Sequence, residues 1–248
     1  METKLQLAIL PQPNDTTCGP TCLHAIYKYY DDNISLQQVI HEVTALERGG
    51  TLAVLLACHA LHRGYSARIY TYNLHMFDPS WFPSEGPDYL KKKLIEQKNA
   101  KPKNKMETAA RAYLDFLDLG GELRFEVLTT AVIRSYLKKG IPILSGLSST
   151  FLYCSTREIP DTNAADDIKG EPVGHFVVFC GYDKESRSVF VADPYRPNPM
   201  AEGHYYNVSI ERTIGAIYLG VLTHDANFLI VQPGKDHKKR LISQESRV

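Results

Sequence analysis

The chain has 248 residues, of which 44% are hydrophobic, enough to bury the core of one large domain or two small ones. Its 28 basic and 28 acidic side chains cancel, so no overall charge attracts it to nucleic acid or to an anionic membrane. No stretch approaches the roughly 18–20 apolar residues that a membrane-spanning helix needs. We therefore expect neither nucleic acid nor a membrane as a partner.

The five cysteines are an odd number and do not follow the spacing of a disulfide framework. Free thiols in a reducing compartment fit this pattern better than a disulfide scaffold. The first ten residues include an acid and lack a small-residue cleavage site before Pro11, so they make a poor signal peptide. These features predict a cytoplasmic protein, and nothing in the sequence indicates a cofactor.

Helices dominate the elements predicted before residue 140. Apolar spacing and capping residues predict helices over 18–30, 36–46, 52–62, 90–97, 106–119 and 130–139. Shorter apolar runs predict strands over 3–10, 65–72 and 125–128. Two stretches interrupt these elements, a proline-rich segment at 73–87 and an exposed lysine-rich loop at 98–105.

Strands dominate after residue 140. They are expected over 141–147, 174–179, 189–193, 204–208 and 227–231, with one helix over 210–219. We expect Ser35, Thr129 and Ser209 to cap the helices that they precede, and Asp15, Thr16 or Thr17 to cap the helix from Cys18. The long loop at 148–172 is expected to be functional or mobile, because structureless loops of this length are uncommon in compact domains.

The order of elements indicates an α+β fold, in which helices pack on a mostly antiparallel sheet. We expect a single domain over residues 1–232, with a helical part at about 14–140 and a sheet part at about 141–232. Residues 233–248 are polar and basic, and we expect them to form a frayed tail.

The stretch from Gln12 to Cys22 holds the first candidate for catalysis. Cys18 lies at the start of a predicted helix, where the helix dipole and free backbone N–H groups favour the nucleophilic thiolate. Gln12, six positions earlier, can donate its amide to an oxyanion beside the sulfur, as acyl transfer requires. Taken alone, Cys18 fits a buried helix-start cysteine equally well, but together with Gln12 and the following Gly19-Pro20 it favours catalysis.

A base for this cysteine is predicted on the later strands. His175 lies near the start of one strand, and Asp193 lies at the end of the next, 18 residues on. A hairpin of two strands can bring them side by side, so Asp193 can hold the imidazole ring. A lone histidine is more often a satisfied core residue, but the neighbouring carboxylate favours a catalytic role.

The segments 12–22, 174–183 and 189–194 resemble the bacteriocin-processing (double-glycine leader) peptidase superfamily, a papain-like branch of the cysteine peptidases. The resemblance implies a papain-like α+β fold in which the nucleophile begins a helix that packs on the sheet carrying His and Asp. It implies Cys18 as nucleophile, His175 as general base and acid, Asp193 as the group that orients the ring, and Gln12 as oxyanion donor. Nothing in the chain resembles a transporter, so we expect a stand-alone soluble relative.

Other residues are weaker candidates. Gly19, Gly174, Tyr195 and Trp81 are predicted to contact substrate, although aromatic residues belong to the core more often than to a cleft. A zinc site at Cys18, Cys22 and His24 would lack a second ligand pair, so no metal is expected. The remaining cysteines, Cys22, Cys58, Cys154 and Cys180, are expected to pack in the core.

The leading hypothesis is a thiol hydrolase that cleaves a peptide or a peptide-like amide. An acyl transferase would use the same acyl-enzyme and pass it to an amine, and the sequence does not separate the two. A third hypothesis is an inactive peptide-binding module of the same fold, which the presence of all four motif residues argues against. We also expect the acidic loop 158–171 to favour substrates of basic character.

Overall fold

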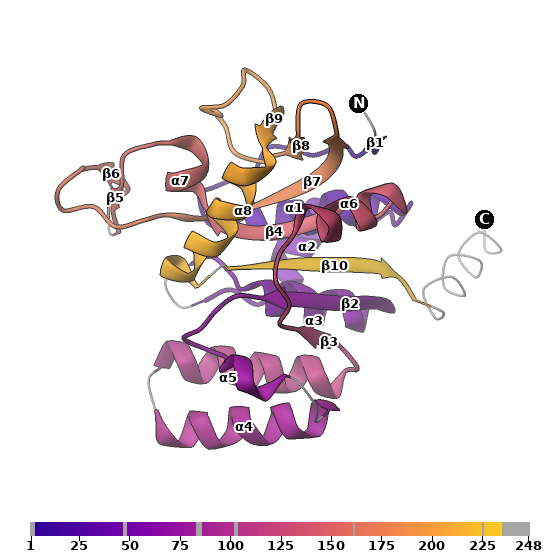
Figure 1. The fold of residues 1–248 in the computed structure, drawn as a ribbon, viewed down its shortest axis with the longest axis vertical. Helices are drawn as coiled ribbons and strands as arrows, with labels where there is room; N and C mark the ends of the chain where they lie inside the picture. The colour runs from indigo at the N-terminus through magenta and orange to yellow at the C-terminus, as the bar shows by residue number, and fades with distance from the viewer. Residues whose placement is uncertain are drawn as a thin grey trace.

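A sheet of eight strands runs through the centre of the molecule (Figure 1). The computed structural model describes residues 3–46, 49–82, 86–101, 104–160, 162–224 and 226–234, so most of the expected tail lies outside the described residues. The strands of this sheet are β1 (Thr3–Lys4), β2 (Tyr65–Thr71), β3 (Glu122–Arg124), β4 (Ile143–Ser148), β7 (Gly174–Asp183), β8 (Ser188–Ala192), β9 (Tyr205–Ser209) and β10 (Asn227–Pro233).

The strand order is β3-β2-β10-β4-β7-β8-β9, with β1 paired to the far end of β7. Neighbouring strands are antiparallel except β2 and β3, which are parallel. The sheet takes β2 and β3 from the part of the chain expected to be helical. The layers therefore do not divide at residue 140, because β3 and β2 form one edge of the sheet.

Each face of the sheet buries a separate core. On β7, Phe176 and Val178 belong to one core, and Val177 and Phe179 belong to the other. Successive side chains of a strand point to opposite faces, so a strand covered on both sides needs a continuous apolar run. This explains why the segment around His175 is almost entirely apolar in the sequence.

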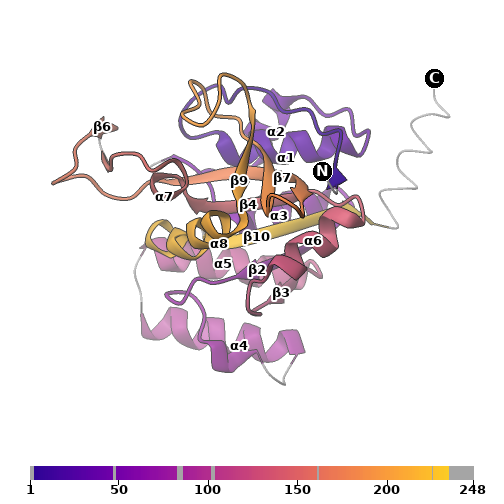
Figure 2. The same cartoon turned by 45° about the horizontal axis from the view of Figure 1, so that its top comes forward.

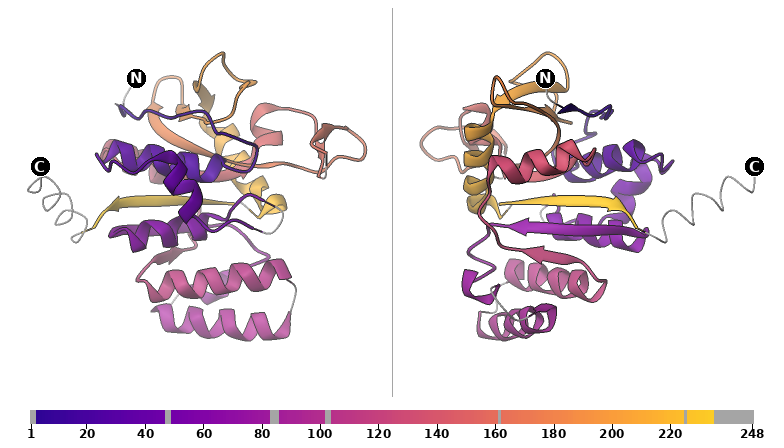
Figure 3. Two further views of the ribbon diagram at one scale, coloured as in Figure 1. Left: turned by 180° about the vertical axis from the view of Figure 1, so that it is seen from behind. Right: turned by 45° about the vertical axis from the view of Figure 1, so that its right-hand side comes forward.

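Helices cover both faces (Figures 1 and 3). One face carries α1 (Cys18–Tyr29), α2 (Leu36–Glu42) and α3 (Ala53–His62), and the other carries α6 (Thr130–Lys138), α7 (Ser149–Tyr153) and α8 (Ile210–Leu219). A helical hairpin of α4 (Gly86–Ala100) and α5 (Asn104–Asp118) packs beside α3, near the β3 edge (Figure 2). Two short 3₁₀ helices are η1 (Pro79–Trp81) and η2 (Gly220–Thr223).

Three predicted caps are confirmed, whereas Thr17, at the N-cap of α1, makes no side-chain capping hydrogen bond. The hydroxyls of Ser35, Thr129 and Ser209 accept hydrogen bonds from backbone N–H groups in the first turns of α2, α6 and α8. Each cap contributes about 1 kcal/mol by satisfying a donor that the helix leaves free. Ser148 caps α7 in the same way, although no helix was expected there.

Several expected boundaries are wrong. The strand predicted over 125–128 lies instead at 122–124, where Glu122–Arg124 pairs with β2. The predicted loop 148–172 contains α7 and a small hairpin of β5 (Glu158–Ile159) and β6 (Ala164–Ala165). The lysine-rich stretch begins within α4, and residues 102–103 lie outside the described residues. The strand expected over 3–10 is reduced to β1.

One hydrogen bond fixes the start of α1 against the start of β7. The Cys22 thiol donates to the backbone carbonyl of Phe176 over 3.2 Å. Cys22 lies one helical turn after Cys18, and Phe176 follows His175. The fold therefore brings Cys18 and His175 together from elements more than 150 residues apart in sequence.

Candidate active site

Cys18 is the first residue of α1 and is partly buried. The next residue, Gly19, is buried because the helix approaches its neighbours closely. A Cβ at Gly19 would lie 2.7 Å from Cγ2 of Thr51 and 3.2 Å from the Phe176 ring. The absence of a side chain at Gly19 thus lets the Cys18 end of the helix sit against β7, which gives Gly19 a packing role.

His175 and Asp193 form a buried pair. Nε2 of His175 lies 2.8 Å from Oδ1 of Asp193, and both side chains are almost wholly inaccessible to solvent. Cys18 also acts on the His175 ring and raises its pKa. Because Asp193 engages Nε2, Nδ1 is the ring nitrogen left to face the sulfur.

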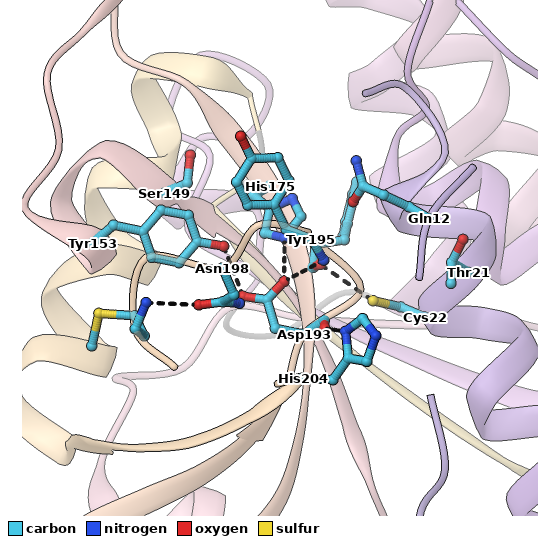
Figure 4. A network of polar contacts seen from close by, with 12 residues as sticks. Gln12, Thr21, Cys22, Ser149, Tyr153, His175, Asp193, Tyr195, Asn198 and His204 are labelled. Carbon is cyan, nitrogen blue, oxygen red and sulfur yellow. Dashed lines mark hydrogen bonds and ion pairs between the residues drawn. The ribbon is translucent and has the colours of Figure 1, made fainter. Parts of the chain in front are cut away.

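Asp193 is held by more donors than its histidine alone (Figure 4). The hydroxyls of Tyr153 and Tyr206 each donate to Oδ2 over 2.7 Å, and the backbone N–H of Tyr195 donates to Oδ1 over 2.9 Å. Hydrogen bonds to a charged group are worth about 1.5–3 kcal/mol each, so this set offsets the cost of burying the carboxylate. The site thus includes two tyrosines, Tyr153 and Tyr206, that sequence reasoning missed.

The two missed tyrosines come from different kinds of segment. Tyr206 points to the core from β9, a strand that was expected, so the alternation of its side chains was a usable signal. Tyr153 ends α7, inside a stretch expected to be a loop, and no local pattern connects it with Asp193, 40 residues later.

The charges of the site shift its pKa values strongly. Burial acts to lower the pKa of His175, but Asp193 and Cys18 raise it to about 10. Burial acts to raise the pKa of Asp193, but the charge and hydrogen bond of His175 lower it to about 2. Burial and the Asp193 charge raise the pKa of Tyr153 and Tyr206, so both hydroxyls keep the protons that they donate.

Gln12 lies on the segment that leads into α1, across from His175 in Figure 4. Its backbone N–H donates to the carbonyl of Pro194 over 2.9 Å, which ties this segment to the residue after Asp193. Its side-chain Nε2 donates to the carbonyl of Asn14 over 2.9 Å. An amide carries a second N–H, so Gln12 retains a donor for a substrate oxygen.

A cleft of about 510 Å³ opens beside the pair. Gln12, Gly174, His175 and Tyr195 all line it. Past Gly174 the cleft continues as a groove of about 440 Å³ toward Thr51 and η2. Of the expected substrate contacts, Gly174 and Tyr195 line this cleft. Gly19 is instead buried within the first turn of α1.

Trp81 is not part of this cleft. It borders a separate hollow at the β3 edge, with Phe82 and Phe125. The structure therefore does not bring Trp81 together with Gln12 and His175. A tryptophan within a segment of irregular structure was the signal for this prediction, and that signal does not specify which side of the fold the segment covers.

The other cysteines occupy different environments. Burial raises the pKa of Cys22, and raises that of Cys58 and Cys180 to about 12, which fits the expected core packing of these thiols. Cys154 is exposed at the end of α7, so its expected burial is wrong. Within the described ranges, no three potential ligands gather in a metal-binding arrangement.

Part of the acidic loop faces the cleft. Glu158 lines it together with Asp15, and burial and the Asp15 charge raise the pKa of Glu158. Glu171 borders the groove beyond. Asp166 instead accepts hydrogen bonds from the backbone N–H groups of two neighbouring loop residues, and Asp161 lies outside the described residues.

The sequence matches the Peptidase_C39 like family over residues 4–218, so the chain belongs to that family. The expected family and the α+β, papain-like fold class are both confirmed. A comparison with curated protein sequences finds no match. In the described part of the chain, no helix has the length and apolar character needed to cross a bilayer.

Solved structures of peptidase domains are also similar to this chain. One is a double glycine motif protease from an AMS/PCAT transporter in complex with the leader peptide, at 16% identity over 93% of this chain and 94% of that one, with a TM-score of 0.44. Another is the peptidase domain of Streptococcus ComA, a bifunctional ABC transporter, at 13% identity over 92% and 99%, with a TM-score of 0.42.

Proposed function

We propose that this chain is a cysteine peptidase that hydrolyses a peptide or peptide-like amide bond through Cys18, His175, Asp193 and Gln12. The observation that carries the proposal is the buried His175–Asp193 pair beside the helix-start thiol. A histidine whose pKa is raised to about 10 keeps its proton at neutral pH, and that proton is needed to expel an amine.

The first half of the reaction forms an acyl-enzyme. The Cys18 thiolate attacks the carbonyl carbon, a C–S bond forms, and the carbonyl electron pair moves onto oxygen. The free amide N–H of Gln12 stabilises that oxyanion. The oxyanion then collapses, the C–N bond breaks, and Nδ1 of His175 gives its proton to the departing amine.

The second half releases the acid. His175, now neutral, takes a proton from water as that water attacks the thioester carbon. The C–S bond breaks, the carboxylic acid leaves, and Cys18 and His175 return to the thiolate–imidazolium state. Asp193 stays ionised throughout and holds the ring with Nδ1 toward the sulfur, while Tyr153 and Tyr206 hold Asp193.

The alternatives differ in the fate of the acyl group on Cys18. An acyl transferase would pass the acyl group to an amine, and a binding module would form no acyl-enzyme at all. Gln12 and His175 line one cleft, and Asp193 bonds His175 beside it, which supports an active enzyme over a binding module. We also place the protein in the cytoplasm, a proposal supported by five cysteines that are all free thiols.

Acylation with an activated ester tests this proposal without a known substrate. A 4-nitrophenyl ester of an N-acetylated amino acid should give a burst of nitrophenolate equal to the enzyme concentration and add one acyl group to Cys18, as seen by peptide mass mapping. Cys18→Ala should abolish the burst, and Cys154→Ala should keep it. Acylation spread over the cysteines, without a burst, would contradict the proposal, and aminolysis by an added amine in preference to water would favour the transferase.

A further inference from the structure

Cys22 is a buried nucleophilic side chain that the proposed reaction does not use. It lies on α1 four residues after Cys18, so the two side chains project from the same side of the helix. Cys22 is wholly inaccessible to solvent, and its thiol donates to the backbone carbonyl of Phe176 over 3.2 Å. Cys18 acts on the ring of His175, the residue before Phe176. Both sulfurs therefore lie against the start of β7.

The spacing of the two cysteines permits a bond between their sulfurs. In a helix, residues four apart have Cα atoms about 6 Å apart, within the roughly 4.4–6.8 Å that disulfides span. Their Cβ atoms, about 5–6 Å apart in a regular helix, must approach to about 4.5 Å. Cys18 is the first residue of α1, and Thr17 before it makes no side-chain capping bond, so the first turn can make this adjustment. Burial, and after it Cys18, raise the pKa of the Cys22 thiol, as expected of two neighbouring sulfurs.

The other three cysteines are placed differently. Cys58 and Cys180 each donate to a backbone carbonyl of a neighbouring segment, and Cys154 is exposed. Cys22 is 0% exposed, so a dissolved oxidant does not reach it and its chemistry must begin at a neighbouring side chain. Cys18 is only partly buried, and it is the neighbour that the proposed function makes reactive.

We propose that Cys22 is a resolving cysteine, which converts a peroxide-oxidised Cys18 into a reversible Cys18–Cys22 disulfide. The proposal rests on the Cys18 thiolate of the proposed function. In the first step the thiolate attacks one oxygen of hydrogen peroxide, an S–O bond forms, the O–O bond breaks, and the departing hydroxide takes a proton from the His175 imidazolium to leave as water. In the second step the Cys22 sulfur attacks the sulfenic sulfur, an S–S bond forms, the S–O bond breaks, and the hydroxide leaves with the Cys22 proton as a second water.

The disulfide would keep the nucleophile recoverable. An unresolved sulfenic acid takes up further oxygen and becomes a sulfinic or sulfonic acid, which thiols do not reduce. A disulfide drawn from a regular helix is strained, and strained disulfides are readily reduced. Its formation also removes the hydrogen bond from Cys22 to Phe176, which holds the start of α1 against β7. The oxidised protein should therefore be inactive until a small thiol reduces it.

Peptide mass mapping reads out this chemistry directly, because one tryptic peptide, residues 5–28, carries both cysteines and no other. We would treat the full chain with an excess of hydrogen peroxide and map it before and after dithiothreitol. The peptide should lose two hydrogen atoms in mass and regain them with dithiothreitol. This loss should be at least about tenfold faster than oxidation of the exposed Cys154.

Two matched serine variants assign the second sulfur. Cys22→Ser keeps a donor for the Phe176 carbonyl but cannot form the disulfide, so its peptide should gain two or three oxygen atoms that dithiothreitol does not remove. Cys180→Ser replaces another buried thiol that donates to a backbone carbonyl, and it should behave like the unmodified protein. A Cys22→Ser protein whose Cys18 is recovered as fully as in the unmodified protein would overturn the proposal.

The outcomes separate this inference from the proposed function. Oxygen added to Cys18 of the unmodified protein, without loss of two hydrogen atoms, would overturn the resolving role and leave the reactive thiol intact. A disulfide from Cys18 to a different cysteine or to a second molecule would overturn that role too. Oxidation of Cys18 no faster than that of Cys154 would instead contradict the reactive thiolate, and the resolving role with it.

Discussion

Asp193 is the residue on which the electrostatics of the candidate site depend. It is fully buried and accepts hydrogen bonds from His175, Tyr153, Tyr206 and a backbone N–H. A buried carboxylate is tolerated only with such partners, and their combined effect keeps it ionised. The ionised group in turn keeps a proton on His175 at neutral pH and fixes the orientation of the ring.

Replacing this charge should impair catalysis more than it impairs folding. Asp193→Asn preserves the size of the side chain but removes the charge that holds the imidazolium. We expect the rate constant of Cys18 acylation to fall by about 10²–10⁴-fold, as for the equivalent change in other triads. Asp167→Asn, an exposed loop carboxylate, is the control and should acylate normally. An Asp193→Asn protein that acylates at the unaltered rate would show that Asp193 is only structural.

The same pair makes stability depend on pH. The pKa of His175 is raised in the folded state, so its contribution is complete below the unfolded value of about 6.5 and is lost as pH rises through about 10. The pKa of Asp193 is lowered, so its contribution is complete above about 3.9 and is lost as pH falls through about 2. The pair therefore stabilises most between about pH 4 and 6.5.

Urea unfolding at pH 6 and pH 9.5 measures this effect. The free energy of unfolding of the unmodified protein should fall between these pH values, and the fall should be smaller in His175→Gln, which has no proton to lose. His62→Gln, an exposed histidine, should behave like the unmodified protein. A fall of the same size in His175→Gln would mean that other groups cause it.

At the scale of elements, the site depends on how closely α1 packs on β7 and on the residues before α3. The Cys22 thiol donates a hydrogen bond to the backbone carbonyl of Phe176, and Gly19 packs against Thr51 and Phe176. These contacts set the distance between the start of the helix and His175. Two residues of the expected motif therefore act through packing. Gly19 allows the start of α1 to approach β7 closely, and the hydrogen bond of Cys22 holds it there.

Gly19→Ala should destabilise the protein by about 1–3 kcal/mol, because the added methyl overlaps Cγ2 of Thr51. Thr51→Ser removes that Cγ2, so the double variant Gly19→Ala/Thr51→Ser should recover part of the loss, as a double-mutant cycle of urea unfolding would show. Gly203→Ala, at a glycine with nothing within 4 Å of the added Cβ, should change stability by less than about 0.5 kcal/mol. Additive effects of Gly19→Ala and Thr51→Ser would contradict the predicted contact.

At the scale of the whole molecule, local patterns predicted the features that short-range physics controls. Spacing or capping within a few residues predicts the helix from Cys18 and the caps Ser35 and Ser209. It also predicts the strand that contains His175 and the strand that ends just before Asp193. Such signals are strong because each depends on neighbours in the sequence.

The features that the sequence did not predict depend on contacts between distant segments. Strand β10 pairs with β2 over seven residues, although some 160 residues separate them, and β3 adds to the edge in parallel. Tyr153 meets Asp193 only because α7 folds over the end of β4 and β7. Periodicity carries no information on such pairings. The pairing of the edge strand β3 and the hydrogen bond from Tyr153 to Asp193 therefore became visible only in the structure.

The central claim is that Cys18 and His175 form a reactive thiolate–imidazolium pair. The rate of iodoacetamide alkylation at each cysteine, followed by peptide mass mapping from about pH 5 to 9, tests it most directly. Exposed Cys154 serves as the reference thiol in the same molecule. Below about pH 7, Cys18 should react at least about tenfold faster than Cys154, and His175→Ala should remove this advantage while His62→Ala keeps it. A Cys18 that reacts no faster than Cys154, whether or not His175 is present, would contradict the claim and leave a binding module of the same fold.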